Sequence, residues 1–450
     1  MRLDKIQINN FKCFENYTVE FAPRTTVLFG RNGVGKTTTI SAIRKALSFV
    51  FSKGKKSKTT PLAPTTGIPS YRVENFSRKG DARRLNEGQV VNEIDITGWG
   101  TFVERISEEW HIKASTASYK TQETGYRQAY EKFIDVVVTT EKLPVLAYYS
   151  DSFPHLDCTV MVHKSIANLR NFGYYMWNVE TSCSSMWVER LERAIRERQN
   201  KEVLIGKYSK DNHNPLYLKD KDIYDTYNRE VNAIECALIS FSQKDEFMPI
   251  ARLSLDDYTG KLQIETTDAR SYDFRNLPAG YRRLYNIVLD MAYRGFVLNS
   301  GLLHDQIEGV ALIDEIDLHL HPALEREVVA RFEHTFPCMQ FIVTTHSPLV
   351  LVNIDTSDKQ DMVLRMGTNQ SSPEKVYDIY GLDYNSGVED VMGVEAADWE
   401  LQSLLRTAVY FERNNANEQF SNLYKFILQK VNGKQATLDK MLKKVREEAE

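Results

Sequence analysis

Residues 30–37 read GRNGVGKT and fit the pattern G-x-x-x-x-G-K-[S/T] of a phosphate-binding loop. The loop follows the β-rich run Thr26–Phe29 and precedes residues 37–51, in which apolar side chains recur at helical spacing. The motif requires this context of a strand before it and a helix after it. Its glycines let backbone N–H groups surround phosphates, and the helix N-terminus adds the positive end of its dipole. The stretch therefore predicts an α/β fold that carries a phosphate site.

The side chains of this loop have different expected roles. We expect Lys36 to reach the β- and γ-phosphates of a nucleotide and Thr37 to ligate Mg²⁺. The other nucleotide contacts that we predict in the segment are Asn32, Gly33, Gly35 and Thr38.

Two carboxylates follow an apolar strand in the second half of the chain. Residues 310–313 read VALI, and Asp314 and Glu315 come next. This places both carboxylates at the C-terminal edge of the strand, where phosphates bind in α/β sheets. We expect Asp314 to hold Mg²⁺, directly or through water, and Glu315 to polarise the attacking water of a hydrolysis reaction. The alternative is that they form an acidic N-cap of the next helix.

Histidines lie close to the same predicted edge. The apolar run Phe341–Thr344 predicts a second central strand, and His346 follows it within reach of a γ-phosphate. His319 and His321 alternate like metal ligands, but the sequence offers no third ligand. We therefore interpret residues 317–322 as a dimer-contact loop.

Residues 277–283, LPAGYRR, precede a predicted helix with one apolar face. Gly280 at such a helix start leaves the N-terminal amides open to an anion. The alternative is that the segment is an ordinary helix start. Its position between the phosphate loop and the carboxylates makes it informative.

The composition of the 450 residues is that of an ordinary globular protein, with 42% hydrophobic and 26% charged residues. No window approaches the ~18 consecutive apolar residues of a membrane-spanning helix, and the first residues lack the apolar run of a signal peptide. The five cysteines form no CxxC pair. We expect a cytoplasmic protein with reduced thiols, and the net charge of −4 gives no global reason to bind nucleic acid.

Changes in pattern along the chain suggest four parts. Residues 1–150 form a first lobe with the phosphate loop, and 151–245 form a charge-rich helical insertion. Residues 246–395 form a second lobe with the carboxylates and His346. Residues 396–450 form a C-terminal helical segment.

The order of phosphate loop, Leu-x-x-Gly-x-Arg segment, Asp-Glu strand and strand-end His resembles the ABC ATPase superfamily. The stretch from Ile6 to Phe14 is similar to the N-terminal strand and turn of the chromosome-maintenance and recombination-repair ATPases, and differs from the start of transporter subunits. The resemblance implies an ABC ATPase head with two lobes, a mixed sheet and an antiparallel lobe, with ATP and Mg²⁺ as cofactors. It also implies a homodimer or higher homo-oligomer.

The same resemblance assigns roles to individual residues. It gives Asp314 to Mg²⁺, Glu315 to catalysis and His346 to γ-phosphate sensing. The segment with Gly280 would complete the site of a partner subunit, and Lys12 would contact the nucleotide.

Two departures from the family pattern bear on activity. Pro278 or Ala279 replaces the usual signature serine, which favours slow hydrolysis, and we find no glutamine that links the sheet to the insertion. The insertion is far too short for a long coiled coil. The compact layout resembles bacterial antiphage ATPases of the Septu PtuA and PARIS AriA type, which pair with a separate nuclease effector.

Alternative functions remain open at this stage. A DNA-repair-type ATPase could act directly on DNA ends or damaged DNA, with the basic run Lys53–Lys58 contacting phosphates. A transporter subunit is disfavoured by the residues around Phe11. Residues after His346 show no nuclease motif, so we predict no intrinsic nuclease site.

The segment Trp399–Glu450 contains helical stretches with apolar faces. We interpret it as a docking element for a partner protein, with the apolar stripe of the last helix laid in a groove. The stripe consists of Leu438, Met441, Leu442 and Val445. The alternative is that these helices cap the second lobe or join copies of the same chain.

Overall fold

The computed structural model describes residues 1–52, 72–85, 89–102, 107–150, 170–178, 184–207, 215–299, 301–368, 370–393, 399–431 and 434–448. The chain divides into two compact units, Met1–Gly381 and Leu382–Glu450, and each is described by itself. None of the described helices is long and apolar enough to cross a membrane.

A six-stranded sheet forms the centre of the first unit, in the order β13-β12-β3-β11-β10-β6. All neighbouring pairs are parallel except the one between β12 and β13. Every residue of β3, β11, β10 and β6 is buried, as expected for parallel strands covered on both faces. The strands are β3 (Thr25–Phe29), β6 (Val145–Tyr149), β10 (Gly309–Ile313), β11 (Met339–Thr344), β12 (Asp361–Arg365) and β13 (Glu374–Val376).

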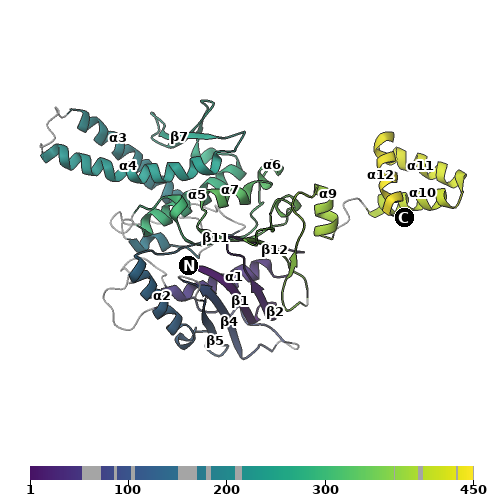
Figure 1. The fold of residues 1–450 in the computed structure, drawn as a ribbon, viewed down its shortest axis with the longest axis horizontal. Coiled ribbons are helices and arrows are strands. Elements are labelled where there is room, and N and C mark those ends of the chain that lie inside the picture. The colour runs from purple at the N-terminus through teal and green to yellow at the C-terminus, as the bar shows by residue number, and fades with distance from the viewer. Residues whose placement is uncertain are drawn as a thin grey trace. The chain divides into compact units, whose positions relative to one another are not determined.

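An antiparallel sheet of order β2-β1-β4-β5 makes the rest of the first lobe (Figure 1). Its strands are β1 (Arg2–Phe11), β2 (Phe14–Glu20), β4 (Glu93–Thr101) and β5 (Ser107–Ser115). Helix α1 (Lys36–Leu47) contacts this sheet and also β11 of the central sheet. The fully buried Trp110 of β5 donates from Nε1 to the carbonyl of Ala46, 2.8 Å away, and so fixes α1 on the sheet. Helix α2 (Arg127–Thr140) packs on β5.

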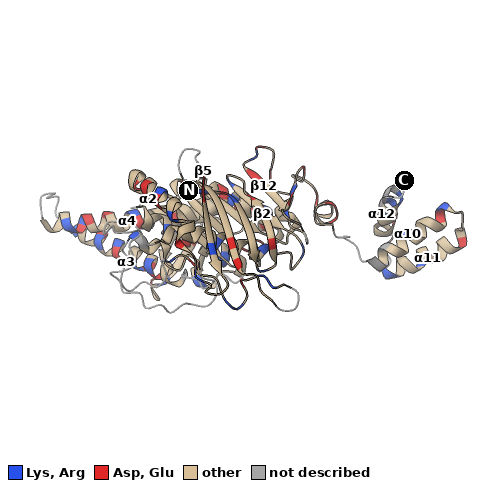
Figure 2. Cartoon of the chain, turned by 90° about the horizontal axis from the view of Figure 1, so that it is seen from below, with Lys and Arg blue, Asp and Glu red and all other residues tan. Residues whose placement is uncertain are grey.

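The insertion is a hairpin of two long helices, α3 (Ser184–Lys207) and α4 (Pro215–Ser242), which extends from the body of the unit (Figure 1). Its base packs on α5 (Ala279–Leu298). There Trp187 stacks on Tyr293 with ring centroids 4.9 Å apart, and Arg190 forms a two-point ion pair with Glu230. Acidic and basic residues are interspersed along both helices (Figure 2).

The second lobe adds a small antiparallel sheet and several short helices. The sheet has the order β7-β8-β9, with β7 (Ile250–Leu255), β8 (Leu262–Thr266) and β9 (Ser271–Asp273). The helices are α6 (Pro322–Glu325), α7 (Val328–Thr335) and α8 (Pro348–Leu351). The predicted α/β class is confirmed, with its mixed sheet, antiparallel lobe, helical insertion and C-terminal helices.

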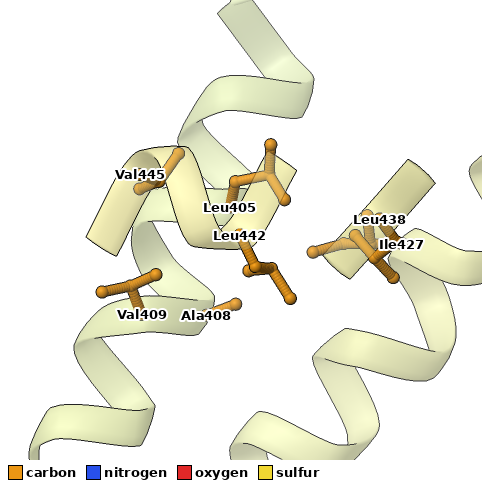
Figure 3. Close-up of a cluster of buried hydrophobic side chains, with 7 residues drawn as sticks. All are labelled: Leu405, Ala408, Val409, Ile427, Leu438, Leu442 and Val445. Carbon is orange, nitrogen blue, oxygen red and sulfur yellow. The ribbon is translucent and has the colours of Figure 1, made fainter. Parts of the chain in front are cut away.

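The second unit holds the short helix α9 (Tyr384–Ser386) and three longer helices, α10 (Trp399–Arg413), α11 (Asn417–Lys430) and α12 (Gln435–Glu448). The longer helices bury their apolar faces on one another (Figure 3). The core consists of Leu405, Ala408, Val409, Ile427, Leu438, Leu442 and Val445.

This core corrects one prediction. The apolar stripe of the last helix was expected to be free for a partner's groove, but Leu438, Leu442 and Val445 lie in the core of the chain's own C-terminal unit. A helix whose apolar face finds a local partner has no reason to leave it exposed. Any docking surface of this unit must therefore lie on its outer side.

Candidate functional site

Three neighbouring strands bring the predicted site residues to one edge of the central sheet. In the order β3-β11-β10 the strands are parallel, with Leu28 opposite Thr344 and Val343 opposite Ile313. The phosphate loop follows β3, His346 follows β11, and Asp314 follows β10. Because parallel strands end at the same edge, these segments are neighbours there, although about 300 residues separate the first from the last.

The phosphate loop has a backbone that glycine makes possible. Gly33 and Gly35 have φ angles of +85° and +105°. A Cβ added to Gly35 would lie 2.4 Å from Cζ of Phe14, so no larger residue fits there. Helix α1 begins at Lys36 without a side-chain cap, which leaves its first amides available to an anion. Around Gly33 a Cβ would meet nothing within 4 Å, as expected for a loop open to a ligand.

Lys36 occupies the interior of this loop. Its Nζ donates to the carbonyls of Gly30 and Arg31 at 2.9 and 3.2 Å. Burial lowers the pKa of Lys36, and the negative charges of nearby carboxylates oppose that shift. The carboxylates are those of Asp314, Glu315 and Asp317. The amine therefore lies in the electric field of the β10 edge, where a phosphate could replace the loop carbonyls as its partner.

The carboxylates after β10 are held by the neighbouring strands. Asp314 is 2% exposed, and its amide donates to the carbonyl of Tyr149 at 2.8 Å. The hydroxyl of Thr344 donates to Oδ1 of Asp314 and accepts from the amide of Glu315 at 2.8 Å. Glu315 has a φ of +50°, which is rare for a residue with a side chain.

The alternative of an acidic N-cap is wrong for this pair. The next helix, α6, has His321 at its N-cap, and Nδ1 of His321 accepts from the amide of Ala323 at 3.2 Å. The carboxylates lie six or more residues before that cap. His321 thus has a capping contact of its own, and His319 lies in the loop between with a φ of +63°.

The segment after β11 is tied to the loop that follows the carboxylates. Oδ1 of Asp317 accepts from the hydroxyl of Thr345 at 2.6 Å and from the amide of His346 at 3.2 Å. His346 is partly exposed at this edge. Asp317 therefore fixes the backbone from which the imidazole projects.

The predicted contact Lys12 comes from the turn between β1 and β2. Its φ is +49°, and its amide donates to the carbonyl of Asp81 at 2.8 Å. The next residue, Cys13, places Sγ 3.1 Å from the position of a Cβ on Gly35. The turn that carries Lys12 thus lies against the phosphate loop.

The residues at this edge fit Mg²⁺ and a nucleotide. Thr37 is exposed in the first turn of α1, Thr38 is half-buried, and Asn32 is exposed in the loop. The hydroxyl of Thr37 and the carboxylate of Asp314 are hard oxygen donors, which Mg²⁺ prefers. Both would hold the metal ion beside phosphates that the loop binds.

Gly280 lies farther along the same unit, near the N-terminus of α5. It is buried, and a Cβ on it would lie 2.6 Å from the carbonyl oxygen of His319. Ala279, one residue earlier, is exposed. The predicted signature segment therefore touches the chain's own loop through Gly280 and presents Ala279 to solvent.

Sequence reasoning placed Arg283 in the signature segment and Asp317 in the contact loop, but it gave neither of them, nor Thr344, a role in holding the site. Thr344 and Asp317 hold the strand ends, and Arg283 of α5 contacts the carboxylate turn. A polar residue that ends an apolar strand was the available signal for Thr344. The basic run Lys53–Lys58 and residues 151–169 after β6 lie outside the described residues.

Three similarities connect the chain to known proteins. Residues 5–270 match the protein family described as AAA domain. The chain is 24% identical to the Retron Ec83 probable ATPase of Escherichia coli over 427 residues, which cover 84% of this chain and 74% of that protein. It is 26% identical to the Septu protein PtuA of Bacillus thuringiensis over 189 residues, which cover 39% of this chain and 46% of that protein. This confirms the predicted resemblance to PtuA-type proteins.

Among solved structures, the SmcHead bound to the C-winged helix domain of ScpA aligns with 84% of this chain and 97% of that chain. The TM-score is 0.43 and the sequence identity is 14%.

Proposed function

Because the chain belongs to the AAA domain family, we propose that it binds and hydrolyses ATP with Mg²⁺ and acts as a regulatory ATPase in antiphage defence. In this proposal ATP holds a homodimer or higher homo-oligomer, which controls a separate nuclease effector. The observation that carries the ATPase assignment is the convergence of the phosphate loop, Asp314–Glu315 and His346 on three adjacent strand ends. The similarity to proteins named Retron probable ATPase and Septu PtuA supports the defence assignment.

Each site residue has a chemical task in this proposal. Lys36 and the open amides of α1 bind the phosphates, and Lys12 contacts the nucleotide from the neighbouring turn. Glu315 polarises the attacking water, and the imidazole of His346 donates to the γ-phosphate. Mg²⁺, held by Thr37 and Asp314, would neutralise charge on the phosphate oxygens.

The signature segment is proposed to complete the site of a second copy. The segment also contacts its own chain's loop at Gly280, and this contact decides which substitution can test completion between copies. An aspartate at Gly280 would clash with His319 within the same chain. The exposed Ala279 already carries a Cβ, so Ala279→Asp adds a charge at this surface without that clash.

We expect Ala279→Asp and Lys36→Ala to be inactive alone and to complement each other. In a mixed dimer, the loop of one chain and the signature of the other rebuild one intact site. A 1:1 mixture that exchanges subunits should recover about a quarter of the original turnover, because half of the dimers are mixed and each has one good site. The rate of phosphate release measures the recovered turnover. Gly280→Asp serves as a comparison, because this variant also disturbs the loop of its own chain. Absence of recovery in mixed dimers of verified assembly would contradict completion between copies.

The C-terminal unit is proposed to dock the effector through its outer surface. It has its own core, and exposed aromatic residues such as Tyr410 and Phe426 are available on it. Buried aromatic anchors are typical of protein interfaces. Truncation at Asn432 would remove α12 and expose the core that α10 and α11 share with it.

We therefore expect a chain ending at Gly393 to bind ATP as the full chain does and to lose co-purification with the protein encoded by the neighbouring gene. Tyr410→Ser with Phe426→Ser is the matched variant, because both side chains are about half exposed or more and lie outside the core. Retained co-purification of the truncated chain would place the docking surface in residues 1–393. Thermal unfolding monitors whether the first unit remains folded.

A further inference from the structure

The N-terminal end of α5 touches the carboxylate loop of its own chain at two points. The first is the close approach of Gly280 to the carbonyl of His319. The second is Arg283, which is 1% exposed. Its Nη1 donates to the carbonyl of Glu315, and its Nη2 donates to the carbonyl of Asp314 at 2.8 Å.

Two of the three contacted residues have unusual backbone conformations. Glu315 and His319 have φ angles of +50° and +63°, in the left-handed region that residues with a Cβ rarely adopt. Such conformations persist only where the surroundings impose them. The end of α5 contacts the carbonyls of both residues and so contributes to holding these conformations.

The guanidinium of Arg283 suits this task better than another cation would. Its planar fork reaches three carbonyls, because Nη2 also donates to Ser150 at the end of β6, 3.3 Å away. It thereby joins the ends of β6 and β10 to the signature helix. These three contacts are made to backbone carbonyls.

We propose that Arg283 is a positioning residue, which holds the turn at Glu315 in its strained conformation and links the catalytic carboxylate to the signature end of α5. This rests on the proposed function, in which Glu315 polarises the water. A displacement of the signature, for example when a second copy's nucleotide contacts it, moves the anchor of Glu315 as well. The state of one site is thus communicated to the carboxylate of the other.

The test compares Arg283→Gln and Arg283→Lys with Arg190→Gln in the full chain. Arg190 is a largely buried guanidinium in the insertion, paired with Glu230, and serves as the control. Arg283→Gln is expected to lower kcat about 100-fold and leave the Kd for ATP within about threefold, because a small misplacement of a reacting group is costly in rate. Arg283→Lys can reach fewer carbonyls and should lose about 10-fold. Arg190→Gln should lower the unfolding temperature and leave kcat within about twofold.

Hydrogen exchange supplies a readout that does not depend on turnover. In Arg283→Gln the amides of residues 315–320 should exchange faster, whereas those of α1 should not. The inference is overturned if the amides of residues 315–320 exchange at the same rate in Arg283→Gln and in the unchanged chain. A normal kcat in Arg283→Gln overturns it as well. If the unchanged chain does not hydrolyse ATP, the proposed function fails, and the exchange result still decides whether Arg283 holds the turn. If Arg283→Gln does not fold, the kcat and the amide exchange of Arg283→Lys are compared with those of the unchanged chain instead.

Discussion

The Glu315→Gln chain is expected to bind ATP as tightly as the unchanged chain and to hydrolyse it about 100- to 10,000-fold more slowly. The amide retains the shape of the side chain and the turn that Arg283 and Thr344 hold, but it cannot accept a proton from water. ATP should therefore persist, and a closed dimer should accumulate. Steady-state phosphate release, ATP titration and light scattering in the presence of Mg²⁺ measure the three quantities.

Glu308→Gln is the matched control for this substitution. Glu308 lies just before β10, at the opposite edge of the central sheet from Glu315, and its carboxylate is paired with Lys142 at 3.3 Å. The same chemical change there should leave turnover unaltered. Undiminished turnover in Glu315→Gln would refute the role of this carboxylate, and weakened ATP binding would show that it contacts the ground-state nucleotide.

The Lys36→Ala chain is expected to bind ATP about 10- to 150-fold more weakly, because a hydrogen bond to a charged group contributes about 1.5–3 kcal/mol. The amine lies inside the phosphate loop and donates to the carbonyls of Gly30 and Arg31. Its removal takes away a ground-state contact, so binding itself should weaken. Equilibrium titration with a slowly hydrolysed ATP analogue measures the change.

Lys45→Ala tests whether loss of any amine from α1 has this effect. The amine of Lys45 is paired with Asp81 at 3.2 Å, so we expect it to contribute to stability and not to phosphate binding. This control should unfold at a lower temperature and retain ATP affinity. Equal affinities of Lys36→Ala and the unchanged chain would mean that the loop binds its ligand without this lysine.

The local sequence was sufficient for the elements that carry the site. The glycines of residues 30–35 indicate a backbone that residues with a side chain rarely adopt. The apolar runs that precede Asp314 and that begin at Phe341 predict strands buried on both faces. Because strand ends in a parallel sheet lie at one edge, the sequence also predicted that Lys36, Asp314 and His346 gather there. These inferences need only the local sequence around each residue and the rule that parallel strands end at the same edge of a sheet.

The tertiary structure alone decided which groups hold the site residues and what covers the last helix. Arg283 contacts the backbone carbonyl of Glu315, and Asp317 contacts the backbone amide of His346. The direction of these backbone groups depends on the turns at Glu315 and His346, which the hydrophobic pattern of the sequence does not predict. The stripe on α12 showed that one face must be covered, but apolar burial is not directional and does not specify the covering surface. That surface proved to be α10 and α11, since the short connections between these helices bring their apolar faces together before any other partner is needed.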